Sequence, residues 1–271
     1  NNTEHAANLF GLKEFGNIYS RLGNPTVGAL EARLTALEDG AMCVALSSGT
    51  SAVMYSLINI MSQGDNFVTA NQLYGGTYTM FDNILPEYGI NSKKVDITDF
   101  EAVESAIDEK TRAIYCETIT NPGLVVADIS ALADIAHSKG IPLIVDATFT
   151  TSAILKPFEF GADIVVYSLT KWMSGHGRVI AGAVIEKGGF DWGNGNFPLY
   201  DKPDTSYGGM RWGHDLGDLG NVSYSLRLRT VPLRNLGANM SPDTAFEVMS
   251  GLETLALSCL LYTSPSPRDE D

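Results

Sequence analysis

The chain has 271 residues, of which 44% are hydrophobic, and its mean hydropathy is close to zero at +0.01. This length and composition describe a globular protein that can bury a large core. The 32 acidic and 18 basic residues give a formal net charge of −14, spread along the chain rather than gathered in one block. Nucleic acid is therefore not an expected partner, because neutralising phosphates requires clustered lysine and arginine.

The cysteines and histidines give no pattern of a metal site or a disulfide framework. Cys43 and Cys116 lie in apolar runs, which predicts buried structural thiols. No apolar run reaches the length of a membrane-spanning helix, and no stretch resembles a signal peptide. We therefore expect a cytoplasmic protein in a reducing compartment, with no metal and no membrane partner.

Short β-rich runs alternate with segments of helical spacing along the chain. The expected strands are, in chain order, 42–46, 66–70, 113–118, 142–148, 163–168 and 181–186. The expected helices are 28–40, 51–62, 99–108, 129–140 and 244–257. This alternation predicts an α/β fold with a mostly parallel sheet and helices on both faces. Ligands bind beyond the carboxyl ends of the strands in such sheets, so the residues that follow each strand are the candidates for a site.

Two segments depart from this alternation. Residues 187–220 are rich in glycine and aromatic residues and are too long for an ordinary connection. We expect an ordered excursion there, over an active site or an interface. After residue 257 the helical pattern gives way to proline, serine and a charged end. We expect 258–271 to be a disordered or foreign tail.

Polar residues follow three of the expected strands, and no GxGxxG, P-loop or GxSxG motif is present. Residues 47–50 precede a helix that is expected to begin near Ser51; exposed N–H groups at a helix start suit a phosphate, although serine and threonine equally suit an N-cap. Asp146 ends an apolar strand and needs a cationic or hydrogen-bonded partner, unless it is an N-cap or a surface acid. Ser168 and Thr170 bracket Lys171, which either reaches a reactive carbonyl or extends to solvent.

Tyr74 precedes two glycines that allow close approach, so its ring could stack on a planar ligand or lie in the core. A phosphate cradle, a buried acid, a flat stacking surface and a lysine together match the needs of pyridoxal 5′-phosphate (PLP). This cofactor binds through its phosphate, requires a carboxylate opposite its pyridinium nitrogen and forms a Schiff base with a lysine. We therefore predict PLP as the cofactor.

Six motifs in order carry a resemblance to a known family. They are IYSRLGNPT, LSSGTSAV, NQLYGGTY, ETITNPG, IVDATFTT and YSLTKWMSGHG. Over residues 2–257 the chain resembles the Cys/Met-metabolism family of PLP-dependent enzymes, the cystathionine γ-synthase-like group. Within that family, the stretches 2–26, 188–209 and 233–246 are most similar to the O-acetylhomoserine sulfhydrylases.

This resemblance implies the PLP-dependent transferase fold of aspartate aminotransferase type I. Residues 1–25 would be the remnant of an N-terminal arm that contacts a neighbouring subunit, and 26–257 would be the PLP-binding domain with its long insert at about 187–220. The smaller C-terminal domain of the family, which carries the arginine for the substrate α-carboxylate, would be missing. The chain is therefore expected to be a fragment.

The resemblance also implies a role for individual residues. Lys171 would be the Schiff-base lysine and the proton shuttle at the substrate α- and β-carbons. Asp146 would pair with the pyridinium nitrogen and keep it protonated, and Thr148 would support Asp146 and the ring. Tyr74 would stack on the pyridine ring and help to protonate the leaving group. Asn121 would contact the ring hydroxyl.

The remaining implied contacts concern the phosphate. In the same subunit it would be held by Gly49, Thr50, Ser168 and Thr170. Tyr19 and Arg21 would reach the phosphate of a neighbouring subunit, and the planar fork of Arg21 suits phosphate oxygens. The resemblance therefore implies a homodimer or homotetramer with an active site shared across subunits.

The implied reaction is γ-replacement on O-acetyl-L-homoserine with sulfide or a thiol, giving homocysteine or methionine plus acetate. Such a transferase belongs to sulfur amino acid metabolism and methionine biosynthesis. The alternatives are a cystathionine γ-synthase or a methionine/cystathionine γ-lyase, since the same residues serve all of these reactions. Gly76 stands where methionine γ-lyases typically carry cysteine, which disfavours that enzyme. A second alternative is an inactive fragment that retains only PLP binding.

Overall fold

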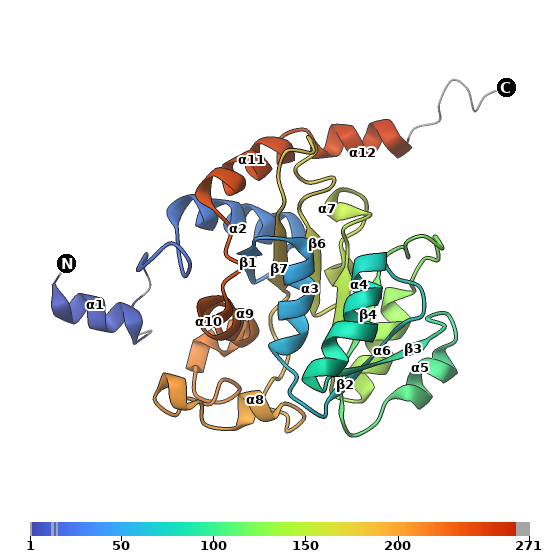
Figure 1. Cartoon of the computed structure of the whole chain (residues 1–271), viewed down its shortest axis with the longest axis horizontal. Coiled ribbons are helices and arrows are strands. Elements are labelled where there is room, and N and C mark those ends of the chain that lie inside the picture. Colours follow the sequence, from blue (N-terminus) through green and yellow to red (C-terminus); the bar gives the residue numbers. More distant parts are fainter. Residues whose placement is uncertain (1, 12–13, 15, 264–271) are drawn as a thin grey trace.

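Seven short strands form one mixed sheet in the computed structural model, which describes residues 2–11, 14 and 16–263 (Figure 1). The strands are β1 (Met42–Leu46), β2 (Asn66–Ala70), β3 (Asn91–Val95), β4 (Thr111–Glu117), β5 (Leu143–Asp146), β6 (Ile164–Ser168) and β7 (Gly182–Glu186). Their order across the sheet is β1-β7-β6-β5-β4-β2-β3. Only β7 is antiparallel to its neighbours, so the predicted mostly parallel α/β sheet is confirmed.

The strand β3 (Asn91–Val95) was not predicted from the sequence. It lies at the edge of the sheet and pairs with β2 alone. Its sequence, NSKKV, carries two lysines and no buried residue. Edge strands need no apolar residues on both faces, and lysine there discourages pairing with another chain. The pattern that identified the central strands is therefore absent from this one.

Helices cover both faces of the sheet. The helices are α1 (Thr3–Phe10), α2 (Pro25–Glu38), α3 (Gly49–Ile58), α4 (Gly75–Thr79), α5 (Phe100–Ala106), α6 (Ile129–Ser138), α7 (Thr151–Ile154), α8 (Pro198–Asp201), α9 (Ser223–Leu228), α10 (Arg234–Leu236), α11 (Pro242–Leu252) and α12 (Leu255–Thr263). The connection from β2 to β3 runs along the sheet in the opposite direction to those from β3 to β4 and from β4 to β5. Because such crossovers are right-handed, α4 lies on one face and α5 and α6 on the other. Helix α3 contacts α4, β6 and β7 and shares the face of α4.

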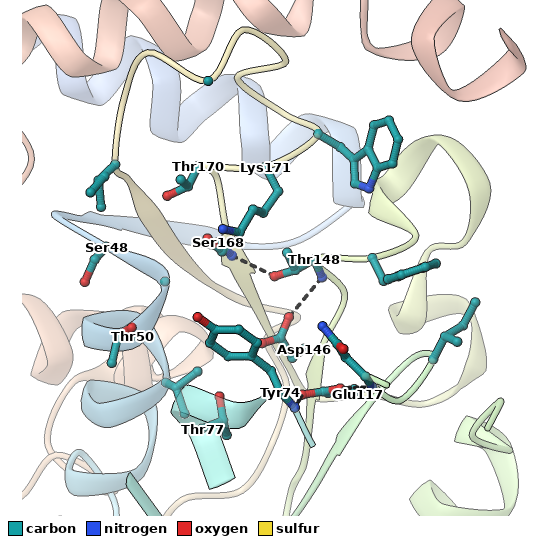
Figure 2. A pocket seen from close by; sticks show the side chains of 18 of the residues that line it. Ser48, Thr50, Tyr74, Thr77, Glu117, Asp146, Thr148, Ser168, Thr170 and Lys171 are labelled. Carbon is teal, nitrogen blue, oxygen red and sulfur yellow. Dashed lines mark hydrogen bonds between the residues drawn. The ribbon is translucent and has the colours of Figure 1, made fainter. Parts of the chain in front are cut away.

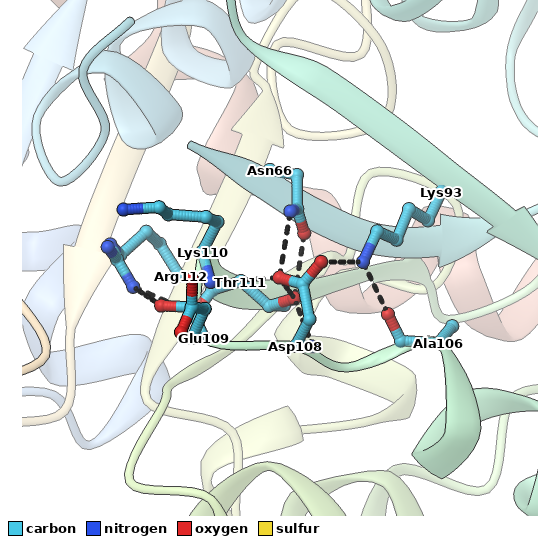
Figure 3. Close-up of polar contacts among 8 residues, drawn as sticks. All are labelled: Asn66, Lys93, Ala106, Asp108, Glu109, Lys110, Thr111 and Arg112. Atoms are coloured by element: carbon cyan, nitrogen blue, oxygen red, sulfur yellow. Dashed lines mark hydrogen bonds and ion pairs between the residues drawn. The ribbon is translucent and has the colours of Figure 1, made fainter. Parts of the chain in front are cut away.

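A hydrogen-bond network ties the amino-terminal ends of β2, β3 and β4 together (Figure 3). The Asp108 carboxylate accepts from Lys93 Nζ at 2.6 Å, Asn66 Nδ2 at 3.0 Å and the backbone N–H of Lys110 at 2.8 Å. Thr111 Oγ1, at the start of β4, lies 3.1 Å from the same carboxylate. The Lys93 ammonium, together with these donors, holds the pKa of Asp108 well below its usual range. This network fixes the end of the sheet opposite to the strand ends where a site was predicted.

The segment 187–220 folds into an ordered layer at the carboxyl end of α3 (Figure 1). Its aromatic side chains pack on one another and on the core. Trp192 stacks on Tyr200 with ring centroids 5.1 Å apart, and both rings are buried. Tyr200 Oη accepts a hydrogen bond of 3.0 Å from Nδ2 of Asn59, the residue that ends α3. A hydrogen bond and aromatic packing therefore hold this layer against the end of α3.

The chain remains helical beyond residue 257, where a disordered or foreign tail was expected to begin. Helix α12 continues to Thr263, so residues 258–263 are helical rather than disordered. The reason is burial: Leu255 and Cys259 are buried, and Trp172 packs on Tyr262 with ring centroids 4.8 Å apart. The rest of the expected tail, 264–271, lies outside the described residues.

No single helix in the described ranges is long and apolar enough to cross a membrane, whereas α11 and α12, which meet at a 51° bend, pass that test together on length and composition.

Candidate active site

A cavity of about 720 Å³ opens at the carboxyl edge of the sheet, between β4, β5, β6 and the start of α3 (Figure 2). Nine of the eleven predicted site residues line it: Gly49, Thr50, Tyr74, Asn121, Asp146, Thr148, Ser168, Thr170 and Lys171. Tyr19 and Arg21 do not. Residues 187–220 contribute nothing to its lining, so the expectation that the long insert covers the active site is wrong for this cavity. The insert lies at the other end of α3.

The start of α3 presents free backbone N–H groups to the cavity. Ser48 is the N-cap, and its hydroxyl accepts from the N–H of Ser51 at 3.0 Å, so the capping interpretation holds for this residue. Gly49 and Thr50 occupy the first two helical positions, whose N–H groups have no acceptor within a helix. A β-carbon at Gly49 would stand 2.5 Å from the β-carbon of Ser168. Glycine therefore lets the helix approach β6 closely enough for both to face one small anion.

Asp146, at the end of β5, is a partly buried acid rather than a surface or N-capping one. Its Oδ1 accepts from the N–H of Thr148 at 2.9 Å, and its Oδ2 accepts from Tyr115 Oη at 3.3 Å. Burial raises the pKa of the Asp146 carboxyl, and the bonds from Thr148 and Tyr115 oppose this. A cation placed against the carboxylate would remove the cost of its burial.

Three hydroxyl residues follow or face the end of β6. Thr148 Oγ1 accepts from the N–H of Ser168 at 2.8 Å and so joins the ends of β5 and β6. Ser168 Oγ makes no hydrogen bond to the described part of the chain and is free to donate to a ligand. Thr170 Oγ1 lies 3.0 Å from the N–H and 3.2 Å from the carbonyl oxygen of Ala181. While it donates to that carbonyl, Thr170 has no hydroxyl proton for a phosphate.

Lys171 stands in a turn whose neighbours anchor it. Leu169 and Met173 are buried on either side, and Ser174 Oγ donates to the carbonyl oxygen of Thr170 at 3.0 Å. The lysine itself is exposed and lines the cavity, with no hydrogen bond or ion pair from Nζ to the described residues. Figure 2 shows its side chain directed toward Ser168 and Thr148. A rigid turn therefore carries a free amine.

Tyr74 is half exposed, which rules out the core interpretation of this ring. Its backbone N–H donates to Glu117 Oε1 at 2.7 Å, and the N–H of Asn121 donates to Glu117 Oε2 at 2.9 Å. Glu117 was not among the predicted site residues, although it ends an apolar strand just as Asp146 does. Burial raises the pKa of Glu117 to about 7, and the nearby Asp146 carboxylate adds to this.

Tyr19 and Arg21 lie before α2 and outside this cavity. Tyr19 is exposed, and the Arg21 guanidinium lies over its ring, 5.0 Å from the centroid. Arg21 Nε is buried without a hydrogen-bond partner. The structure therefore leaves this pair apart from the nine residues that it brings together.

A mostly parallel α/β sheet with a free lysine, a partly buried carboxylate and an anion-ready helix start is the arrangement expected of a protein that binds a flat, phosphorylated ligand. Comparison with known sequences narrows this class: the chain belongs to the family of Cys/Met metabolism PLP-dependent enzymes, whose profile matches residues 1–260. The family resemblance found in the motifs is confirmed, and the family carries the predicted cofactor, PLP.

Several similar proteins are named as sulfhydrylases or homocysteine synthases. The chain is 44% identical over 260 residues to O-acetyl-L-homoserine sulfhydrylase of Leptospira meyeri, covering 94% of this chain and 59% of that protein. It is 44% identical over 257 residues to homocysteine synthase of Schizosaccharomyces pombe, with coverage of 94% and 59%. The chain thus spans about 59% of the length of these relatives.

Solved structures agree with this assignment. A putative O-acetylhomoserine (thiol)-lyase from Campylobacter jejuni, which contains N′-pyridoxyl-lysine-5′-monophosphate, matches with a TM-score of 0.90 and 40% identity over 94% of this chain and 63% of that one. Cystathionine γ-lyase from Lactobacillus plantarum matches with a TM-score of 0.71 and 32% identity over 88% of this chain and 54% of that one.

Proposed function

We propose that this chain belongs to a PLP-dependent transferase that replaces the acetoxy group on the γ-carbon of O-acetyl-L-homoserine with sulfide or a thiol, releasing acetate. The products would be homocysteine or methionine and acetate. The observation that carries the proposal is the convergence of Lys171, Asp146 and the Gly49 helix start on one cavity. The similarity to sulfhydrylases and homocysteine synthases supports this particular substrate.

The cavity residues fit PLP. The absence of a β-carbon at Gly49 lets the start of α3 pack against the end of β6, which brings the N–H groups of Gly49 and Thr50 close to the free hydroxyl of Ser168, where phosphate oxygens would bind. The partly buried Asp146 carboxylate suits a protonated ring nitrogen, and Thr148 orients that carboxylate. The two hydrogen bonds between Thr170 and the backbone of Ala181 support a role for Thr170 in the shape of the turn more than in holding the phosphate.

When bound, the cofactor supplies an electron sink for negative charge at the substrate α-carbon. Lys171 Nζ would take the α-proton and return it to a neighbouring carbon, because its amine is free and its turn is fixed. Asp146 would hold the proton on the ring nitrogen. Tyr74 would cover the ring and give a proton to the departing acetate, while Asn121 would contact the ring hydroxyl.

We also propose a homodimer or homotetramer. Tyr19 and Arg21 lie outside the cavity of their own chain, which supports a role for them at the phosphate of a second copy. The small-molecule partners would be the amino-acid substrate and the sulfide or thiol. The acidic composition and the metabolic relatives support a cytoplasmic location.

Cofactor binding can be tested with the purified chain and PLP. We expect a visible absorbance band that borohydride removes, with the label mapped by peptide analysis to Lys171. The Lys171→Ala variant should lose the band, whereas Lys202→Ala, at an exposed lysine outside the cavity, should keep it. A label spread over many lysines, with no band, would overturn the cofactor assignment.

The reaction can be tested with the full-length gene product, O-acetyl-L-homoserine and sulfide. Homocysteine is the expected product, and its absence from the PLP-loaded protein would overturn the sulfhydrylase proposal. Release of 2-oxobutyrate without a thiol would assign γ-elimination instead. Gly76 argues against the methionine γ-lyase alternative, since a β-carbon there would stand 2.7 Å from Cε1 of Tyr74 and displace its ring.

A further inference from the structure

Glu117 is a buried carboxyl that bonds to two loops of the cavity at once. It ends β4 and is 6% exposed. One oxygen accepts from the backbone N–H of Tyr74 at 2.7 Å, and the other accepts from the backbone N–H of Asn121 at 2.9 Å. Tyr74 lies 43 residues before Glu117, so the carboxyl joins segments that are distant in the sequence.

The loop at Tyr74 has few other anchors near the ring. Tyr74 is the N-cap of α4, yet no side chain caps that helix. Two glycines follow it, and its own ring is half exposed. The direction in which the ring leaves the backbone therefore depends on where the Tyr74 N–H is held, and Glu117 Oε1 holds it (Figure 2).

Glu117 also lies beside Asp146. The two residues are register partners on the parallel strands β4 and β5, so their side chains leave the same face of the sheet. Glu117 therefore attaches the Tyr74 and Asn121 loops to the same pair of strands that carries the Asp146 carboxylate.

We propose that Glu117 is a positioning residue that sets Tyr74 and Asn121 against the cofactor through their backbone N–H groups. This inference rests on the proposed function, because it assigns Tyr74 and Asn121 to the cofactor ring. To hold both N–H groups, the Glu117 side chain needs two acceptor oxygens. Glutamine has the same shape but only one acceptor oxygen, so its amide group would place a donor against one of the two N–H groups.

The chain offers a matched control in Glu186. This residue ends β7, is 1% exposed and accepts from the backbone N–H groups of Ser225 at 2.8 Å and Tyr224 at 3.4 Å. It lies outside the cavity. The variants Glu117→Gln and Glu186→Gln therefore make the same chemical change at two buried strand ends, of which only one faces the proposed cofactor site.

The first measurement is amide hydrogen exchange in the chain without PLP. In the unsubstituted chain, we expect protection of the Tyr74 and Asn121 amides. Glu117→Gln should speed exchange at one or both by roughly tenfold, the factor for losing one hydrogen bond, and Glu186→Gln should leave both unchanged. Exchange of these two amides at the rate of a free loop in the unsubstituted chain would overturn the inference without any variant.

The second measurement is PLP affinity and the visible circular dichroism of bound PLP. We expect Glu117→Gln to weaken PLP binding by roughly tenfold and to change the dichroic band, since a mobile ring at Tyr74 no longer fixes the cofactor. Glu186→Gln should leave both readouts unchanged. Equal effects of the two variants would reduce Glu117 to a general stabilising role and overturn the inference. If the unsubstituted chain binds no PLP, the proposed function fails, while the exchange measurement still decides whether Glu117 holds the two loops.

Discussion

Gly49 and Ser168 are in closer contact than any other residue type at position 49 would allow. A β-carbon on Gly49 would stand 2.5 Å from Cβ, 2.8 Å from Cα and 2.8 Å from Oγ of Ser168. Residue 49 opens helix α3 and residue 168 ends strand β6, so this contact sets the distance between the helix start and the strand. Both sides of the proposed phosphate site depend on that distance.

The Gly49→Ala variant should therefore lose both stability and PLP affinity. We expect a loss of about 1–3 kcal/mol in the free energy of unfolding, because the backbone must shift to admit the methyl group. Urea unfolding and PLP titration would measure the two effects. The control is Gly28→Ala in α2, where an added β-carbon meets nothing within 4 Å. That change should raise stability by about 0.5–1 kcal/mol and leave PLP affinity unaltered. Unchanged PLP affinity in Gly49→Ala would contradict the proposed phosphate site.

The Asp146→Asn variant should weaken PLP binding while keeping the fold. Asparagine can still accept from the Thr148 N–H, but it carries no charge to pair with a protonated ring nitrogen. Loss of one charged hydrogen bond corresponds to about 1.5–3 kcal/mol, or roughly a 10- to 100-fold weaker affinity in a PLP titration. Asp128→Asn, at the N-cap of α6, should leave affinity unchanged, because asparagine caps a helix as well as aspartate does. An unaltered affinity in Asp146→Asn would remove this residue from the cofactor site.

The stability of the chain should fall as pH rises through the range in which its buried glutamates ionise. Burial raises the pKa of Glu186 to about 7, above its ordinary value of 4.5. Between these two values the unfolded chain has lost the proton and the folded chain still holds it, so the free energy of unfolding decreases as pH rises from about 4.5 to about 7. Glu38 and Glu117, whose pKa values burial also raises to about 7, contribute with the same sign.

The Glu186→Gln variant isolates one of these contributions. Removing the ionisable group should reduce the change in unfolding free energy between about pH 5 and about pH 7 by up to about 3 kcal/mol. Urea unfolding at several pH values measures that change for the variant and the unsubstituted chain. Two parallel curves would show that Glu186 ionises at its ordinary pKa despite its burial.

The Tyr200→Phe variant tests whether the insert layer acts on stability alone. It removes the bond from Asn59 Nδ2 to Tyr200 Oη and should cost about 1 kcal/mol in unfolding free energy. PLP affinity should not change, because Asn59 and the cavity lie at opposite ends of α3. A weaker PLP affinity in this variant would show that α3 transmits a displacement along its length.

The strands in the middle of the sheet and most residues of the candidate site could be predicted from the amino-acid pattern alone. Buried central strands are apolar on both faces, as residues 113–116 and 164–167 are, so their pattern is visible without a structure. Asp146, at the end of the apolar run that begins at residue 142, and Lys171, three residues after the stretch 163–168, could then be identified, because a carboxylate or a lysine beside an apolar strand requires a binding partner or a chemical role. The motif order added the family.

Other features could not be predicted, because they depend on contacts between segments that are distant in the sequence. The edge strand β3 is polar because it has one neighbour, and α12 continues past residue 257 because Cys259 and Tyr262 find contacts with distant segments. The insert at 187–220 packs at the far end of α3, which its composition could not indicate. Glu117 acquires its importance from two backbone N–H groups on separate loops. Local patterns record burial and propensity, whereas hydrogen bonds between distant segments exist only once the chain has folded.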